Sequence, residues 1–160
     1  KAQDDRFPRK NWPFVTGPID IIILEGWCLG SQPQDANSLL KPLNKLEEIQ
    51  DPDMVWRTYV NDQLQTNYSE LFESFDKLIF LKAPGIKAVH NWRQEQEAKL
   101  AQKSNSLNTE IMDESQMSEF LQHYERLTRE NLNHLSLLAD VTMDLNEYHH
   151  VTSTFYREKG

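Results

Sequence analysis

Apolar side chains dominate residues 19–24, and this run ends abruptly in Glu25 and Gly26. A strand that is apolar on both faces is typical of a parallel sheet covered by helices on either side. The pattern therefore predicts a buried strand over 19–24 with Glu25 at its carboxyl end. Ligands of open α/β sheets bind in the crevice beyond such ends, so Glu25 is a candidate for chemistry rather than packing. The alternative is a terminal glutamate that is only solvated or that caps the next element.

The periodicity of apolar positions predicts an alternation of strands and helices along the rest of the chain. Further strands are expected at 78–81, at 140–145 and, as an edge strand or hairpin partner, at 150–157. Helices are expected at 51–64, at about 68–75, at 86–101 and from a capping box at 113–116 to about residue 132. Loops are expected at 1–18 and at 27–48, the second a long active-site loop with a short helix near Leu39. This order of elements predicts an α/β fold in which helices flank a parallel sheet.

The composition limits the classes of protein to consider. The 160 residues suffice for a single domain over 1–160 with one core. The net charge is −8, from 17 basic and 25 acidic residues without a basic block, which argues against a nucleic-acid partner. Cys28 is the one cysteine, so an intrachain disulfide is excluded and a reducing, cytoplasmic location is expected. The apolar runs are too short to span a bilayer, and nothing in the sequence indicates an oligomeric state.

Two charged residues suggest phosphoryl transfer. In P-loop nucleotide kinases a carboxylate after an apolar strand orients Mg²⁺, and a mobile lid brings arginine over the transferring phosphoryl group. Glu25 fits the first role. Arg93 fits the second, since it lies on the helix that leads into the polar loop at 102–110, within a lid region expected at about 86–133. The alternative for Arg93 is an ordinary ion pair with Glu97, one turn further along the same helix.

The phosphate-binding loop of such kinases, G-x-x-x-x-G-K-[ST], is absent from residues 1–160. Without its backbone amides and its lysine, these residues have no cradle for nucleotide phosphates. The chain begins at Lys1 rather than Met, and its opening residues are polar without strand or helix periodicity. We therefore expect the phosphate-binding loop and its strand to precede Lys1 in a longer chain.

Several longer motifs are distinctive, above all Leu-Glu-Gly-Trp at 24–27 and Trp-Arg-x-x-Gln-Glu at 92–97. They belong to a set of segments that runs from about residue 10 to the end: IDIIILEGWCLGSQPQ (19–34), KPLNKLE (41–47), DPDMVWRTYVNDQL (51–64), FDKLIFLKAP (75–84), VHNWRQEQEAKL (89–100), MSEFLQHYERLTRENL (117–132) and ADVTMDLNE (139–147). Together these segments resemble the carboxyl-terminal two thirds of the D-glycerate 3-kinase family, which comprises plant-type glycerate kinases and their yeast and bacterial kinase-like relatives.

The resemblance implies a P-loop kinase fold, with ATP and Mg²⁺ as cosubstrates. It implies phosphorylation of a hydroxyl on a small molecule, which in the named enzymes is the 3-hydroxyl of D-glycerate. It also places Glu25 after the Walker B strand, as a magnesium residue, and Arg93 on the helix that feeds the lid.

An acidic acceptor would need cations near the Leu-Glu-Gly-Trp turn. Lys41, Lys45 and Arg57 are the candidates, and arginine is the better bidentate partner of a carboxylate. Gly26 and Trp27 are candidates for the wall of the acceptor site, although a tryptophan in such a position is more often core.

Two alternatives stay open. The acceptor could be a nucleoside, a pantothenate-like compound or a sugar phosphate, as in other kinases of the same branch. The chain could instead be a non-catalytic binding or regulatory protein that kept the fold and lost the phosphate-binding loop.

Overall fold

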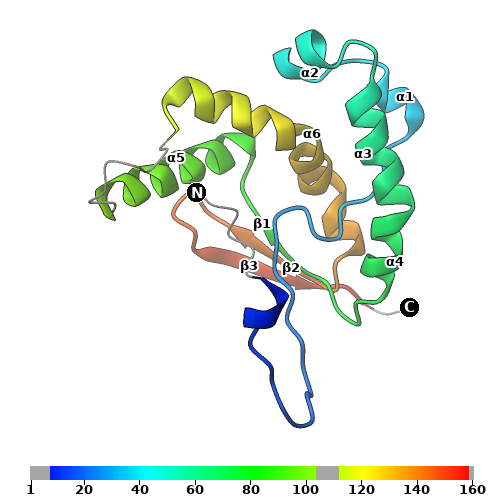
Figure 1. Ribbon diagram of the computed structural model, residues 1–160, viewed down its shortest axis with the longest axis vertical. Coiled ribbons are helices and arrows are strands. Elements are labelled where there is room, and N and C mark those ends of the chain that lie inside the picture. The colour runs from blue at the N-terminus through cyan, green and yellow to red at the C-terminus, as the bar shows by residue number, and fades with distance from the viewer. Residues whose placement is uncertain (1–7, 104–111, 159–160) are drawn as a thin grey trace.

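The computed structural model describes residues 8–103 and 112–158, apart from the side chains of 100–103, and contains a sheet flanked by helices (Figure 1). The sheet has three strands in the order β1 (Ile79–Lys82), β2 (Val141–Leu145) and β3 (Val151–Tyr156). β1 and β2 pair in parallel, with Ile79 opposite Val141. β3 returns beside β2 as an antiparallel hairpin partner, which makes the sheet mixed. The expected α/β class is confirmed, and so are the strands expected at 78–81, 140–145 and 150–157.

Two long helices form the largest helical unit. α5 (Ile86–Lys103) and α6 (Glu114–Leu138) pack against each other, and α6 also contacts β1 and crosses one face of the sheet (Figure 1). The expected capping box is present at the start of α6, where the Asp113 carboxylate accepts from the Gln116 amide at 2.8 Å and the Gln116 side chain accepts from the Asp113 amide. Helix α6 continues to Leu138, beyond the expected end. Residues 104–110 of the expected polar lid loop lie outside the described residues.

The remaining helices lie between residues 9 and 73. They are a 3₁₀ turn at Arg9–Asn11, α1 (Ala36–Leu39), α2 (Lys45–Gln50), α3 (Val55–Gln65) and α4 (Asn67–Glu73). Helix α2 falls inside the segment expected to be loop. It begins at Lys45 and is capped by Asn44, whose side chain accepts from the Glu47 amide at 3.0 Å. No helix in the described ranges has both the length and the apolar character that a bilayer crossing requires.

The expected start of α3 at residue 51 is wrong, and Met54 occupies the N-cap position. Residues 51–53 form a turn, Met54 takes a left-handed backbone conformation with φ of 62°, and the helix starts at Val55. The Asp51 carboxylate still reaches the first turn, where it accepts from the backbone amides of Trp56 at 2.8 Å and Arg57 at 3.1 Å. An acidic side chain therefore caps this helix from outside it.

The buried strand expected at 19–24 is the principal error. Residues 12–25 form an extended loop that projects from the sheet (Figure 1), and the side chains of Ile22 and Ile23 are 83% and 86% exposed. The described residues offer this run no neighbouring strand, so its backbone groups have no ladder to join. Burial of apolar side chains is favourable, but it requires an opposing surface against which they can pack.

The core is small and centres on α6. Met117, Leu121 and Leu135 are buried along one face of this helix, as the apolar spacing predicts. On β1, Ile79 and Leu81 are exposed, because α6 covers one face of the sheet and alternate residues of a strand point to opposite faces. The strand forms as expected, but it is not buried on both faces.

Candidate functional site

Hydrogen bonds between polar side chains hold the segment 27–50, called here the anchored loop, along α6. The Asn131 amide donates to the Ser31 hydroxyl at 2.8 Å, in a buried contact. The Gln34 amide donates to the Glu130 carboxylate at 2.8 Å. Both contacts join residues more than 90 positions apart in the sequence, so the anchored loop has a fixed path on the helix.

Arg126 of α6 makes several hydrogen bonds to the anchored loop. Its Nε donates to one oxygen of Glu47 at 2.7 Å and its Nη2 to the other at 2.6 Å. The same guanidinium donates to the carbonyls of Ser38 at 3.0 Å and Lys41 at 2.9 Å. Burial alone would raise the pKa of Glu47, but hydrogen bonds from Arg126 and from the Leu43 amide lower it below its ordinary value. The backbone of Lys41, a candidate acceptor ligand, is held by the hydrogen bond that its carbonyl accepts from Arg126, and Lys41 itself is exposed.

Arg57, another candidate acceptor ligand, is enclosed by the protein. Its side chain is 4% exposed, and its Nη1 lies 3.0 Å from the Asp51 carboxylate. Its Nε donates to the Leu39 carbonyl at 2.7 Å. In this structure the Arg57 guanidinium joins α3 to α1 and to the turn before α3, so its charge is satisfied internally rather than presented to solvent.

Trp27 links the turn after residue 24 to both long helices. Its indole stacks on Tyr124 of α6, with ring centroids 4.5 Å apart and planes 11° from parallel. The Arg93 guanidinium carbon of α5 lies 5.9 Å from the Trp27 ring centroid and 5.2 Å from that of Phe120. These cation–π contacts place Arg93 beside the Glu-Gly-Trp turn. The structure thus brings together Trp27 and Arg93, two candidates that lie 66 positions apart in the printed sequence.

Arg93 does not make the ion pair that helical spacing offers with Glu97. In the described part of the chain its Nη1 donates to the Gln96 side chain. The Nε of Arg93 and the Nε2 of His90 are buried and have no hydrogen-bond partner among the residues that the structure describes. His90 lies one turn before Arg93 and was missed as a candidate by the sequence analysis. A spacing of three residues on one helix is the signal that pairs them.

Glu25 lies at the exposed edge of this cluster. Its carboxylate is in contact with solvent, and the described residues provide it with no ion pair. Gly26 follows, and a Cβ added there would lie 3.2 Å from the Leu29 side chain, so a larger residue would press on the turn.

Glu25 could bind a magnesium ion only together with ligands from another molecule. Within the described residues no group of three or more His, Cys, Asp or Glu side chains is placed to hold a metal ion. Mg²⁺ in kinases is commonly bound through one or two carboxylates together with nucleotide phosphates. Glu25, as a single exposed carboxylate oxygen donor, fits that second arrangement.

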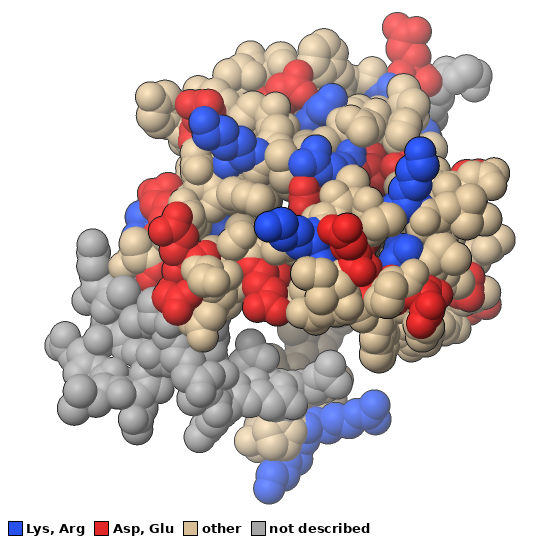
Figure 2. Space-filling view, turned by 90° about the horizontal axis from the view of Figure 1, so that it is seen from above, with Lys and Arg blue, Asp and Glu red and all other residues tan. Residues whose placement is uncertain are grey.

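Acidic and basic side chains are interspersed on the face shown in Figure 2, without a contiguous basic patch. This distribution gives that face no strong attraction for a polyanion.

Comparisons of sequence give two related kinases. The chain is 26% identical over 123 residues to "D-glycerate 3-kinase, chloroplastic" of Arabidopsis thaliana, a match that covers 77% of this chain and 24% of the relative. It is 29% identical over 104 residues to "Uncharacterized kinase mug58" of Schizosaccharomyces pombe, covering 64% of this chain and 35% of the relative. The chain thus spans about a quarter to a third of the length of these curated relatives. No family model matches it.

Comparisons of structure give the same kind of protein. A D-glycerate 3-kinase from Cryptococcus neoformans superposes with a TM-score of 0.68 at 20% identity, covering 89% of this chain and 52% of that one. The YGR205w protein superposes with a TM-score of 0.56 at 24% identity, covering 88% of this chain and 49% of that one. The chain therefore resembles D-glycerate 3-kinase and related kinase-like proteins in sequence, and it shares the fold of the part of them that it covers.

Proposed function

We propose that the protein carrying this chain is an ATP-dependent kinase that phosphorylates a hydroxyl of a small, glycerate-like acceptor. The observation that carries the proposal is the meeting of the Glu25–Gly26–Trp27 turn with Arg93, in a fold shared with D-glycerate 3-kinase. Glu25 lies two residues before the indole that Arg93 contacts, and a carboxylate and a guanidinium are the two kinds of charge that phosphoryl transfer uses.

In this proposal Glu25 binds a cation and Arg93 binds anionic oxygen atoms. Glu25 holds Mg²⁺ together with nucleotide phosphates, and the bound ion supplies charge neutralisation at those phosphates. Arg93 stabilises the phosphoryl oxygens as their negative charge redistributes in the transition state. The rings of Trp27 and Phe120 support its guanidinium, so less side-chain freedom is lost when it engages the phosphoryl group.

The acceptor is held by the turn and by the anchored loop. Trp27 is 45% exposed, because Tyr124 covers one face of its indole, and the open portion walls the acceptor site together with Gly26. Lys41 binds the acidic group of the acceptor with its exposed side chain, while Arg126 fixes its carbonyl. Arg57 serves the site as a brace between α1 and α3.

The phosphate-binding loop lies outside residues 1–160 in this proposal, because these residues contain no such motif. Two features support a further piece of sheet. The relatives are longer than the matched region, and the exposed apolar run 19–24 needs a neighbouring strand to bury it. A strand beside this run would bring a phosphate-binding loop to the same sheet edge as Glu25.

The test is the Glu25→Gln variant of the intact protein, assayed for ADP release with ATP, Mg²⁺ and a panel of hydroxy acids, nucleosides and sugar phosphates. We expect one acceptor class to raise ADP release above the background rate, and the variant to lose about 100-fold or more in turnover. Its thermal unfolding should match that of the unchanged protein, because Glu25 is exposed and makes no ion pair in the described structure.

Glu48→Gln is the matched control, since Glu48 is an exposed glutamate on α2. This control should keep full turnover. Wild-type turnover in Glu25→Gln would remove Glu25 from the site. ADP release that no acceptor raises, together with no ATP binding by calorimetry, would favour the non-catalytic alternative.

A further inference from the structure

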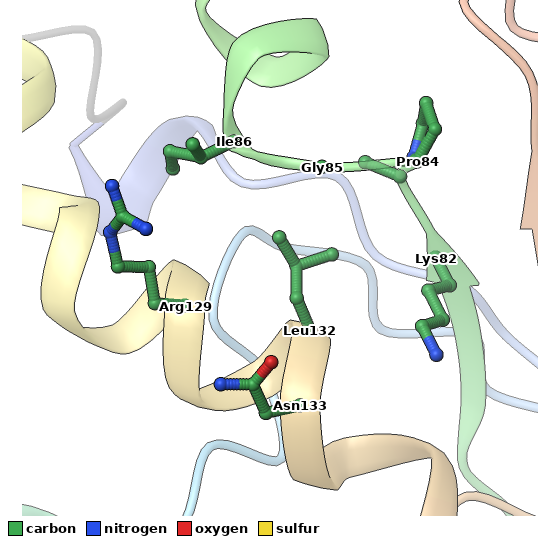
Figure 3. A pocket seen from close by; sticks show the side chains of 8 residues that line it. Lys82, Pro84, Gly85, Ile86, Arg129, Leu132 and Asn133 are labelled. Atoms are coloured by element: carbon green, nitrogen blue, oxygen red, sulfur yellow. The ribbon is translucent and has the colours of Figure 1, made fainter.

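A cavity of about 320 Å³ lies where β1 ends, between the loop at 83–86 and the middle of α6. Figure 3 shows Lys82 on the strand side and Arg129 on the helix side, with Leu132 and Asn133 between them. Its volume is at the lower end of the range of small-ligand pockets. Its position, at the carboxyl end of a parallel strand, is where α/β proteins commonly bind ligands.

The charges that line this cavity are of one sign. Lys82 and Arg129 are the two charged residues of its lining, and no carboxylate lines it among the described residues. Asn133 adds an amide, and Leu132 an apolar surface. In a chain with a net charge of −8, a cavity with two cations on opposite walls attracts a small anion.

Lys82 is available for such an anion. Its register partner on β2 is Asp144, whose carboxylate accepts the Ser153 hydroxyl at 2.9 Å. No ion pair joins Lys82 to Asp144 or to another carboxylate within the described ranges. The Lys82 charge is therefore not neutralised by direct contact.

Arg129 is held in position with one edge left open. Its Nε and Nη2 both donate to Glu125, at 2.9 and 2.7 Å. Its Nη1 makes no hydrogen bond with the described residues. Glu125 also accepts from the Asn44 amide at 3.1 Å, which ties this carboxylate to the anchored loop. The guanidinium thus has a fixed orientation and a spare donor edge, which is the arrangement that oxyanion recognition uses.

We propose that this cavity binds a compact oxyanion, the carboxylate or phosphate group of a small polar metabolite, through Lys82, Arg129 and Asn133. The ammonium of Lys82 binds as a point charge, and the open edge of Arg129 supplies directional donors. Nothing in this argument requires phosphoryl transfer, so the proposal goes beyond the kinase activity. The cavity is separate from Lys41, which the proposed function assigns to the acidic group of the acceptor.

The experiment is a titration of the intact protein without ATP, followed by calorimetry and by the amide NMR signal of Gly85, which lines the cavity. The probes are inorganic phosphate, D-glycerate as a carboxylate, and glycerol as a neutral molecule with the same hydroxyl chemistry. We expect phosphate or glycerate to shift the Gly85 signal and glycerol to leave it unchanged. The probe that binds more tightly identifies the source of the oxyanion.

Lys82→Met and Arg129→Met should each weaken binding by about tenfold or more, because each removes a charge-assisted hydrogen bond. Lys87→Met is the control for Lys82, since Lys87 is exposed in the first turn of α5 and does not line the cavity. Arg157→Met is the control for Arg129, because both arginines are 46% exposed and paired with a carboxylate. Both controls should bind as the unchanged protein does.

The outcomes separate this proposal from the proposed function. Equal binding by the unchanged protein and Lys82→Met, or no shift of Gly85 with either anion, overturns the oxyanion site whatever the kinase assay gives. Anion binding lost in Lys82→Met and Arg129→Met, in a protein that transfers no phosphate to any acceptor, supports the site and rejects the kinase.

Discussion

The apolar run at 19–24 and the anchored loop at 27–50 are neighbours in sequence and opposites in structure. The run is rich in isoleucine and is exposed. The loop is rich in polar residues, yet Ser31 and Glu47 are buried in it, and its short helix α2 packs on α6. Hydrophobicity alone would have predicted the reverse.

The anchored loop is fixed because its polar groups meet partners at defined positions. Arg126 satisfies a carboxylate and two carbonyls of the loop at once. Burying charge in this way is unfavourable unless each group is paired and hydrogen-bonded, a condition that Arg126 and Glu47 meet. The apolar run has no such directional contacts, and the non-directional attraction between apolar surfaces requires an opposing surface.

Among the polar contacts, the largest effect on stability should come from removing the Arg126 side chain, which attaches the anchored loop to α6. Arg126→Met leaves the Glu47 carboxylate without its partner at a site where the two side chains are 12% and 9% exposed. We expect a loss of about 3 kcal/mol in the free energy of unfolding, measured by chemical denaturation. The double variant Arg126→Met, Glu47→Leu should recover part of this loss, because no unpaired charge stays buried.

Arg129→Met is the comparison for that variant, since its pair with Glu125 lies within one helix and Arg129 is half-exposed. Its loss of stability should be below about 1 kcal/mol. Equal losses for Arg126→Met and Arg129→Met would show that the anchored loop does not depend on its buried ion pair.

A smaller effect should appear in acid at the start of β2. The backbone amide of Leu78, followed by the Lys77 ammonium, lowers the pKa of Asp140 from 3.8 to about 2. A carboxyl group with a lowered pKa stabilises the fold above its ordinary pKa, and this contribution is lost as the pH falls through the folded-state value. Asp140→Asn should therefore be less stable than the unchanged protein at pH 6, and the difference should vanish between about pH 4 and about pH 2.

The exposed Asp53→Asn provides the reference for this acid titration. Its stability should follow that of the unchanged protein across the whole pH range. A stability difference for Asp140→Asn that persists at pH 2 would mean that the side chain acts by packing rather than by its charge.

The smallest effect should come from the apolar run itself. Ile22→Ser in the 160-residue chain should change the free energy of unfolding by no more than about 0.5 kcal/mol, because the side chain is 83% exposed. Leu121→Ala, at a side chain that is 4% exposed, should cost about 2–5 kcal/mol.

In a longer form of the protein that includes a phosphate-binding loop, the cost of Ile22→Ser should rise to about 1–3 kcal/mol, because a neighbouring strand would then bury it. An unchanged cost in that longer form would argue against the proposed extra strand.

Local signals predicted the elements that depend on a few consecutive residues. The sequence correctly predicted three such features. They are the capping box at Asp113 and Gln116, the helical spacing of α5 and α6, and the hairpin of β2 and β3. The type and position of Glu25 and Arg93 predicted them as site residues, and their role stays a prediction. Their placement around Trp27 depends on rings of α6 that no local pattern connects to them.

The sequence by itself determined most of the helices and strands, because those preferences act within one or two turns of the chain. The exceptions are the strand expected at 19–24, which does not form, and helix α2, which begins in a segment expected to be loop. Tertiary structure decided which residues are buried: Arg57 and Glu47 are enclosed, and Ile22 and Ile23 are exposed. Burial depends on partners that lie far along the chain, such as Arg126 for Glu47, 79 positions away. A charged side chain is buried where such a partner satisfies it, and an apolar side chain stays exposed where no surface covers it.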